Sequence, residues 1–258
     1  MIKSLNELAE YVKSSGVKTR IAVACAEDQN TLGAIARAVQ DGFVHGILLG
    51  SRQKILSVCS SESIDASIFE IIDVSDASKA TVEAVRMVKE NEADVLMKGL
   101  VGTDKFLKAV LDKQKGLLPP KAVMSYVCAL QIPQYRKLLF VSDTAVLPFP
   151  DLEQKQAMIK YAVKMAHRFG ITSPKVALIS ATEKVSNAFP ATIDYALLSK
   201  MGDRGQFPKC TIDGPLDIFL ACDPESIAIK NVPTPIDGDA DVLIFPNIEA
   251  ANSFYKGL

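Results

Sequence analysis

The chain of 258 residues is 48% hydrophobic and 23% charged, and its formal net charge at pH 7 is −1. A chain of this length and apolar fraction buries one large core or two medium ones, so a folded globular protein is expected. The near-neutral charge, with no basic cluster and no tryptophan, argues against a nucleic-acid-binding surface.

No segment has the composition of a membrane span or a secretory signal. The longest apolar runs, such as residues 242–246, are strand-length and far below the roughly 20 residues of a spanning helix. Residues 1–16 mix acidic and polar side chains with apolar ones and lack the apolar stretch of a secretory signal. The 5 scattered cysteines have no C-x-x-C spacing, which indicates buried thiols rather than disulfides or a zinc site. We therefore expect a cytoplasmic protein without a metal.

Short apolar runs alternate with stretches of helical periodicity in the first half of the chain. The predicted strands are residues 21–26, 45–50, 69–74 and 94–99, and the predicted helices include residues 31–41 and 77–91. A helix between two neighbouring strands forms a crossover, and crossovers make the strands parallel. The pattern predicts an α/β lobe with a mostly parallel sheet.

A second α/β series follows, with predicted strands at residues 137–142, 175–180, 210–213 and 241–245. The clearest helix, residues 151–169, has Asp151 as N-cap, Gln154 as capping-box partner and Gly170 as a left-handed stop. The proline-containing segment 131–136 separates the two series. We expect lobes of residues 1–133 and 134–258, with a cleft between them.

The end of the fourth predicted strand has the layout of an anion site. This strand runs into Lys98 and Gly99, and a turn then leads to Thr103 at the start of a helix. A glycine lets the backbone approach a ligand, and the helix start offers free N–H groups and a positive dipole end. Lys105 and Lys108 could add charge, although ordinary solvated lysines fit this segment equally well.

Polar residues also follow the strands of the second lobe. Asp143 stands at the end of one strand, where it could orient a substrate or brace the loop. Lys184 and Ser186 follow the next strand and suit a phosphate or pyrophosphate.

Three further polar residues are weaker candidates. Asp213 begins an Asp-Gly-Pro sequence that is also typical of a simple turn. Asn247 and Asn252 lie after the last strand, where they could cap a helix or contact a ligand.

Several familiar catalytic patterns are missing. His45 and His167 are isolated, which disfavours a Ser-His-Asp or Cys-His hydrolase. Neither the G-x-x-x-x-G-K-[ST] nor the G-x-G-x-x-G motif occurs, which removes the P-loop and the usual dinucleotide fingerprint. Lysines, hydroxyls and backbone amides remain, and these groups suit the binding of phosphates and the polarisation of carbonyls.

A series of segments, in this order, resembles the phosphate acetyltransferase and phosphate butyryltransferase family, with the butyryl branch nearer. They are residues 94–101, 137–143, 150–155, 190–194, 198–206, 213–216, 238–246 and 251–256. The resemblance covers nearly the whole chain. It implies two α/β domains related in fold to isocitrate and isopropylmalate dehydrogenases, with the substrates meeting in the cleft between the lobes.

The resemblance also implies a reaction. Coenzyme A would attack the acyl phosphate carbonyl directly as its thiolate, without a metal, a tightly bound cofactor or a covalent enzyme intermediate. The partners would be an acyl-CoA or acyl phosphate and inorganic phosphate, with no nucleic acid and no membrane, and the family implies a homodimer. The protein would supply position and charge, including a donor to the oxyanion that is often worth about 3 kcal/mol.

The sequence departs from the family pattern in two ways. Lys108 and Lys121 stand where family arginines are expected, and lysine lacks the bidentate fork of arginine. The family also continues past residues 251–256 into a segment with a Ser-Arg pair and an acidic catalytic residue, which would complete the first lobe and is absent from these 258 residues. No catalytic residue can therefore be assigned.

The leading hypothesis is a phosphate acyltransferase for a short acyl group of butyryl or acetyl type. The alternatives are a non-catalytic paralogue that binds coenzyme A or phosphate, a truncated inactive form, and a different reaction on the same fold. The predicted binding residues are Lys98, Gly99, Thr103, Lys108 and Lys121 in the first lobe, with Asp143 near them, and Lys184, Ser186, Asp213, Asn247 and Asn252 in the second.

Overall fold

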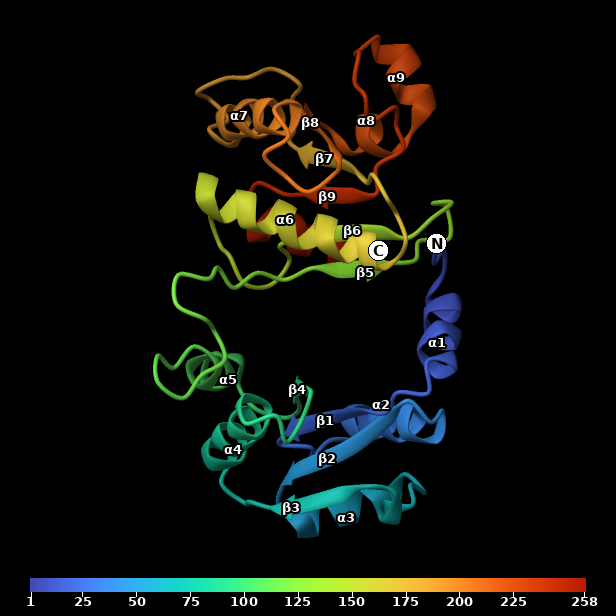
Figure 1. Ribbon diagram of the computed structural model, residues 1–258, viewed down its shortest axis with the longest axis vertical. Helices are drawn as coiled ribbons and strands as arrows, with labels where there is room; N and C mark the ends of the chain where they lie inside the picture. The colour runs from blue at the N-terminus through green and yellow to red at the C-terminus, as the bar shows by residue number, and fades with distance from the viewer. The chain divides into compact units, whose positions relative to one another are not determined.

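The computed structural model describes residues 1–258, and the chain forms two compact units. The larger unit comprises Met1–Leu8 and Val123–Leu258, and the smaller unit comprises Ala9–Ala122. Helix α1 (Leu5–Ser14) runs from the first of these into the second. Each unit has its own sheet, parallel or mostly parallel, with helices on both faces (Figure 1), so the prediction of an α/β fold is confirmed.

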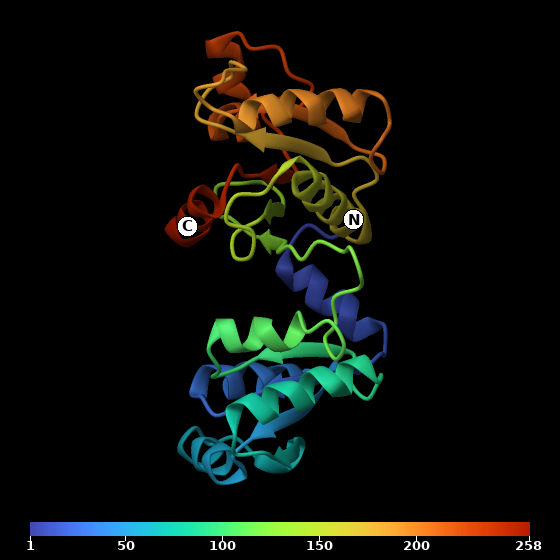
Figure 2. The same ribbon diagram turned by 90° about the vertical axis from the view of Figure 1, so that its left-hand side faces the viewer.

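This division differs from the expected lobes of residues 1–133 and 134–258. Met1–Leu8 belongs to the larger unit, because Ile2 N donates to Phe169 O at 2.8 Å and Leu5 N donates to Gln131 Oε1 at 2.9 Å. Figure 2 shows the N-terminus beside the end of helix α6 (Leu152–Arg168). Residues 123–133 also belong there, since they contain the edge strand β5 (Cys128–Leu130) of its sheet.

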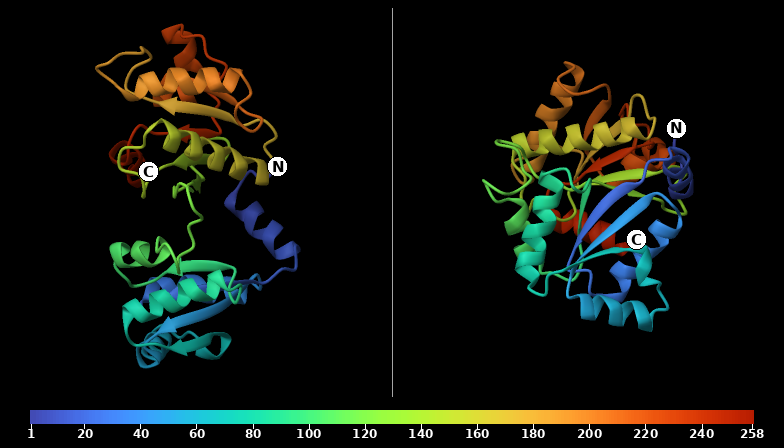
Figure 3. Two further views of the ribbon diagram at one scale, coloured as in Figure 1. Left: turned by 60° about the vertical axis from the view of Figure 1, so that its left-hand side comes forward. Right: turned by 60° about the horizontal axis from the view of Figure 1, so that its bottom comes forward.

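The smaller unit has a four-stranded parallel sheet with strand order β3-β2-β1-β4. The right-hand view of Figure 3 shows its strands side by side. A 3-10 helix at Ala66–Ile68 precedes β3. The strands and helices that follow α1 are β1 (Thr19–Ala24), α2 (Gln29–Gln40), β2 (Val44–Gly50), α3 (Arg52–Ser61), β3 (Glu70–Asp73), α4 (Ala77–Lys89), β4 (Val95–Lys98) and α5 (Thr103–Val110).

Alternating side chains of these strands fill two separate cores. Ala22 and Ala24 of β1 pack with residues of α4 and α5, whereas Val23 packs with residues of α2 and α3. Because both faces are buried, the inner strands read as continuous apolar runs rather than as alternating ones. Ligands are therefore excluded from both faces of this sheet.

The larger unit has a five-stranded sheet with strand order β5-β6-β9-β7-β8, in which only β5 is antiparallel. One core lies under α6 and α7, and the other lies under α8 and α10. Its remaining elements are β6 (Leu139–Ser142), β7 (Lys175–Ile179), α7 (Ala191–Asp203), β8 (Thr211–Leu216), α8 (Ile218–Cys222), α9 (Pro224–Lys230), β9 (Val242–Ile244) and α10 (Ile248–Gly257).

The ends of α6 agree with the sequence prediction. Asp151 Oδ1 accepts from Gln154 N at 2.8 Å, and Gln154 Oε1 accepts from Asp151 N at 2.9 Å. Gly170 has φ +88°, which is the left-handed stop. None of the helices combines the length and the apolar composition that crossing a membrane requires.

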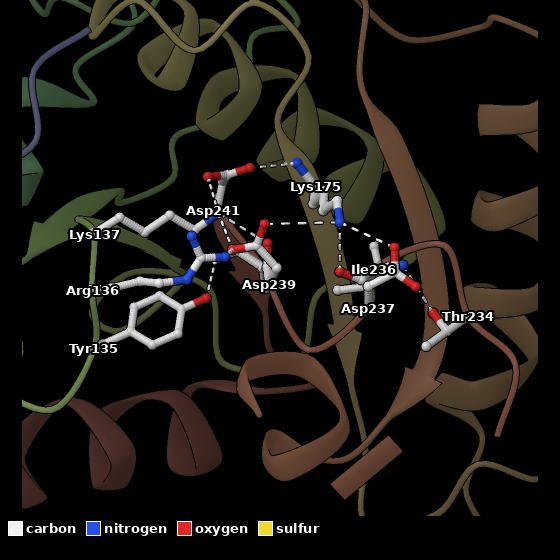
Figure 4. Close-up of polar contacts among 10 residues, drawn as sticks. Tyr135, Arg136, Lys137, Lys175, Thr234, Ile236, Asp237, Asp239 and Asp241 are labelled. Carbon is white, nitrogen blue, oxygen red and sulfur yellow. Dashed lines mark hydrogen bonds and ion pairs between the residues drawn. The ribbon is translucent and has the colours of Figure 1, made fainter. Parts of the chain in front are cut away.

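A cluster of charged residues joins the starts of β6, β7 and β9 (Figure 4). Asp241 accepts from Lys137 Nζ at 2.6 Å and from Lys175 N at 2.8 Å. Asp239 lies 2.7 Å from Lys137 Nζ and also contacts Arg136. Burial by itself would raise the pKa of Asp239, but the charges of Lys137 and Arg136 outweigh burial and lower it. The cluster holds together strands that are far apart in sequence.

We expect Asp241→Ala to lower the free energy of unfolding by about 3 kcal/mol, because it leaves a half-buried Lys137 with one partner fewer. The matched control is Asp203→Ala, which removes an ion pair with Lys200 whose side chains are 62% and 66% exposed. That control should change stability by less than about 0.5 kcal/mol. Urea unfolding followed by circular dichroism measures both, and equal losses would contradict a stabilising role for the cluster.

Candidate functional site

A pocket of about 680 Å³ opens at the carboxyl edge of the sheet in the larger unit. Ile179 and Ser180 at the end of β7, and Phe245 and Pro246 after β9, form its base. In open α/β sheets, ligands bind beyond the carboxyl ends of the strands. The side walls are mostly apolar and include Phe149, Pro150, Phe189, Pro190 and Ala250.

Local hydrogen bonds shape the loops around this pocket. Thr192 Oγ1 donates to Phe189 O at 2.7 Å and accepts from Ser186 N at 2.9 Å, which ties the loop that carries Phe189 to the first turn of α7. Asn247 caps α10, because its Oδ1 accepts from Ala250 N at 2.9 Å. Side-chain hydrogen bonds to the backbone thus hold the loop that carries Phe189 and the start of α10.

One ion pair lies in the wall of the pocket. Lys155 Nζ of α6 lies 2.7 Å from Asp194 Oδ2 of α7, and the two side chains are 5% and 28% exposed. The ammonium also stands 6.0 Å from the centre of the Tyr195 ring. A buried charge is tolerated only when it is paired, and Asp194 supplies the partner.

The sequence prediction did not include Lys155 or Asp194, although a signal for Lys155 was present. Lys155 lies three, four and seven residues before Met158, Ile159 and Ala162, so it occupies the buried stripe of α6. A lysine on a buried stripe is unusual, and its charge needs an acidic partner inside the fold. Asp194 carries no comparable signal, because its pairing with a residue 39 positions earlier arises only in the folded chain.

The carboxyl end of β4 in the smaller unit offers a second, different surface. Lys98 is exposed there, and its Nζ donates to Gly99 O at 3.3 Å. Helix α5 begins at Thr103 without a side-chain N-cap, so N–H groups of its first turn are unpaired. The exposed ammonium and the helix start form a positive surface that suits an anion. The carboxylate of Asp104 in the same turn offsets part of this charge.

Gly99 has a structural explanation. Gly99 N donates to Ala24 O at 2.9 Å, and a Cβ at this position would overlap the carbonyl oxygen of Cys25. The backbone therefore approaches the end of β1 closely, and this packing accounts for the glycine without a ligand.

The two lysines that stand at expected arginine positions lie on a helix and in a turn. Lys108 lines a groove of about 710 Å³ between α4 and α5, together with Lys105 and Lys89. Lys121 lies in an exposed turn with φ +63°. Lys98 and Lys121 do not line this groove.

Asp143 is almost fully buried and braces a loop. Its carboxylate accepts four hydrogen bonds, two of them from Ser125 Oγ and Tyr126 N at 3.0 Å and two from Ala145 N and Val146 N at 2.8 and 2.9 Å. All of its partners belong to the larger unit.

Two further predicted residues have structural partners in the larger unit. Asn252 Nδ2 donates to Thr144 O at 2.9 Å, next to the loop that Asp143 braces. Asp213 lies inside β8 opposite Ala177, where a turn was a possible interpretation of the sequence. The strand continues past Asp213 with a register shift instead of turning.

The remaining predicted residues lie near the pocket to different degrees. Lys184 is exposed on the loop after β7, and its backbone N–H donates to Thr182 Oγ1 at 3.2 Å. Ser186 is held by Thr192 at the start of α7. Of the predicted residues in this unit, Asn247 lines the pocket. Across both units, no three His, Cys, Asp or Glu side chains come together in a way that could hold a metal ion.

Comparison with known proteins identifies the family. Residues 75–258 match the family model described as phosphate acetyl/butaryl transferase. The chain belongs to this family. The phosphate butyryltransferase of Clostridium acetobutylicum is 41% identical over 258 residues, which are 100% of this chain and 85% of that protein. The family resemblance drawn from the sequence segments is thereby confirmed.

Other members of the phosphate acetyl/butaryl transferase family agree. The phosphate acetyltransferase of Thermotoga maritima is 36% identical over 98% of this chain and 85% of its own length. A crystal structure of a branched-chain phosphotransacylase from Enterococcus faecalis V583 matches with a TM-score of 0.80 and 25% identity, covering 93% of this chain and 83% of that one. The same fold therefore accompanies the family sequence.

We expect Asp143→Ala to lower the free energy of unfolding by about 3 kcal/mol or more, because four donors from two segments lose the buried carboxylate that accepts from them. The contrasting variant is Lys184→Ala, which removes an exposed side chain and should change stability by less than about 0.5 kcal/mol. Urea unfolding of the two variants is the test. A stable Asp143→Ala protein would show that the carboxylate is not needed to brace the loop.

Proposed function

We propose that this protein is a phosphate acyltransferase that moves a short acyl group, of butyryl or acetyl type, between coenzyme A and inorganic phosphate. The observation that carries this proposal is the 41% identity to a phosphate butyryltransferase along the entire chain. The acetyltransferase of Thermotoga maritima, at 36% identity, supports the inclusion of acetyl among the acyl groups.

The proposed reaction needs positioning and charge rather than a cofactor. In the thioester-forming direction, the thiolate of coenzyme A attacks the carbonyl carbon of the acyl phosphate. A C–S bond forms, the C–O bond to phosphorus-bound oxygen breaks, and inorganic phosphate leaves with the electron pair. Holding both substrates in reactive geometry and donating hydrogen bonds to the transient oxyanion are the two contributions a protein makes to such a step.

We assign the phosphate group to the carboxyl end of β4. The exposed ammonium of Lys98 and the uncapped start of α5 at Thr103 support this assignment, since both favour an anion. Lys108 and Lys121 of the smaller unit, and separately Lys184 of the larger unit, are exposed cations that stay candidates for binding phosphate groups. The other predicted residues have structural contacts, and we assign them to the fold: Gly99, Asp143, Asp213, Ser186 and Asn252. Asn247 lines the pocket of the larger unit.

Purified protein incubated with butyryl-CoA or acetyl-CoA should release free coenzyme A only when inorganic phosphate is present. A thiol reagent follows the release, and hydroxylamine trapping of the acyl phosphate identifies the second product. The matched control omits phosphate and measures simple thioester hydrolysis. The rate should rise with phosphate concentration and then saturate, because phosphate is a bound substrate.

The outcomes separate the alternatives. Release without phosphate would show a thioesterase, which the proposal does not allow. A folded protein that binds coenzyme A but shows no release with either thioester would indicate a binding paralogue without turnover.

The same proposal includes the cytoplasm as the location, where coenzyme A thioesters are metabolised, and a homodimer as the assembly. Apolar residues on the outer face of α7 support self-association, since Ile193 and Leu197 stand one turn apart and are 39% and 49% exposed. Light scattering should give twice the chain mass of 27.9 kDa. A monomer at all concentrations would refute the dimer and leave the activity untouched.

A further inference from the structure

Lys155 is the one charged side chain that α6 buries, and its ammonium has unused hydrogen-bonding capacity. An ammonium carries three N–H donors, and this one donates to Asp194 alone. Its side chain is 5% exposed and lines the pocket at the carboxyl edge of the sheet. A buried donor without a partner is costly, so an acceptor inside the pocket is the natural complement.

Stability does not require an ion pair at this position. Lys155 lies on the same stripe as Met158 and Ile159, and a methionine would fit there with a side chain of similar length. Replacing a buried ion pair by apolar residues of similar volume is often neutral or stabilising. We therefore look for the role of the ion pair in the ligand that the pocket binds.

The pair presents hydrogen-bond donors and an acceptor side by side. Lys155 presents N–H donors, and Asp194 uses Oδ2 for the lysine and keeps Oδ1 as an acceptor. The pantetheine arm has two trans amides, so the carbonyl of one could accept from Lys155 while the N–H of the other donates to Asp194. A phosphate would be disfavoured, because the two charges cancel and the carboxylate repels a dianion.

The size and the apolar lining of the pocket indicate which part of the thioester substrate it can hold. At roughly 30 Å³ per non-hydrogen atom, a butyryl group with about 5 such atoms occupies about 150 Å³. The pantetheine arm of coenzyme A, with about 18 such atoms, occupies about 540 Å³. The pocket measures about 680 Å³ and is lined by Phe149, Phe189 and Ile179, which suit the methyl and methylene groups of the arm.

We propose that Lys155, held by Asp194, is a positioning residue that binds an amide of the pantetheine arm in this pocket. The inference rests on the proposed function for the identity of the thioester. It adds a residue pair and a subsite to that function. The arm lies along the apolar side chains of the pocket, and the ion pair fixes how far along the pocket the arm is placed. Binding of an uncharged amide thus positions the thiol end of coenzyme A. The phosphate groups of the substrates bind elsewhere, at exposed cations.

The test compares Lys155→Met with Lys164→Met, which removes an exposed lysine from the same helix. Calorimetry measures the binding of pantetheine and of coenzyme A, and steady-state kinetics measures the KM values for acyl-CoA and phosphate. Lys155→Met should weaken both ligands about tenfold, because a hydrogen bond to a charged group is lost. The KM for acyl-CoA should rise with it, while kcat and the KM for phosphate stay within about twofold.

A second variant, Asp194→Asn, removes the negative charge of the pair, whereas Lys155→Met removes the positive charge. Lys155 keeps a polar neighbour but loses its counter-charge, so the pocket becomes positive. We expect pantetheine binding to weaken, and binding of inorganic phosphate to the pocket to strengthen severalfold. Thermal unfolding of each variant confirms that the larger unit is folded, and Lys155→Arg should recover part of the affinity.

The results distinguish this inference from the proposed function. Pantetheine binding that depends on Lys155, in a protein that transfers no acyl group, keeps the inference and overturns the activity. Acyl transfer in a Lys155→Met protein with unchanged pantetheine affinity overturns the inference and keeps the activity. Three other results also overturn the inference. The first is a rise in the KM for phosphate alone, and the second is an equal effect of Lys155→Met and Lys164→Met. The third is a lack of pantetheine binding by the unaltered protein.

Discussion

Both sheets of this protein are covered by helices on both faces, and this constraint decides where ligands can bind. Parallel strands require crossover connections, and the crossover helices occupy the two faces. Neighbouring residues of β1, Ala22 and Val23, already point into different cores. What remains accessible is the edge at which the strands end and the next helices begin. The pocket beside β7 and β9 and the uncapped start of α5 are both at such an edge.

Most polar side chains at these edges serve the fold itself. Backbone N–H groups in the loops need acceptors, and the Asp143 carboxylate accepts from three of them and from the Ser125 hydroxyl. Asn252 supports the same loop, and Asn247 caps the last helix. A polar residue after a strand is thus weak evidence of a ligand. The stronger indication is a buried group whose hydrogen-bonding capacity the protein leaves unused, as at Lys155.

The two edges differ in charge, and the difference matches the two kinds of group in the proposed reaction. At the end of β4, an exposed lysine and a helix start combine positive charge with open solvent, which favours an inorganic anion. In the pocket of the larger unit, Lys155 and Asp194 neutralise each other among apolar walls, which favours a neutral polar ligand. Under the proposed assignments, this difference in charge separates the phosphate site from the site that recognises the thioester.

The sequence alone determined the alternation of strands and helices, the capping box of α6 and the family. These features depend on residues within one turn, one strand or one short segment, so they are readable along the chain. The tertiary structure decided which side chains share a surface: Lys108 lines the groove beside α4, and Gly99 packs on β1. It also drew residues 123–133 into the larger unit through β5, and paired Lys155 with a carboxylate 39 residues away. Burial and partnership arise between segments far apart in sequence, and only the folded chain brings these segments together.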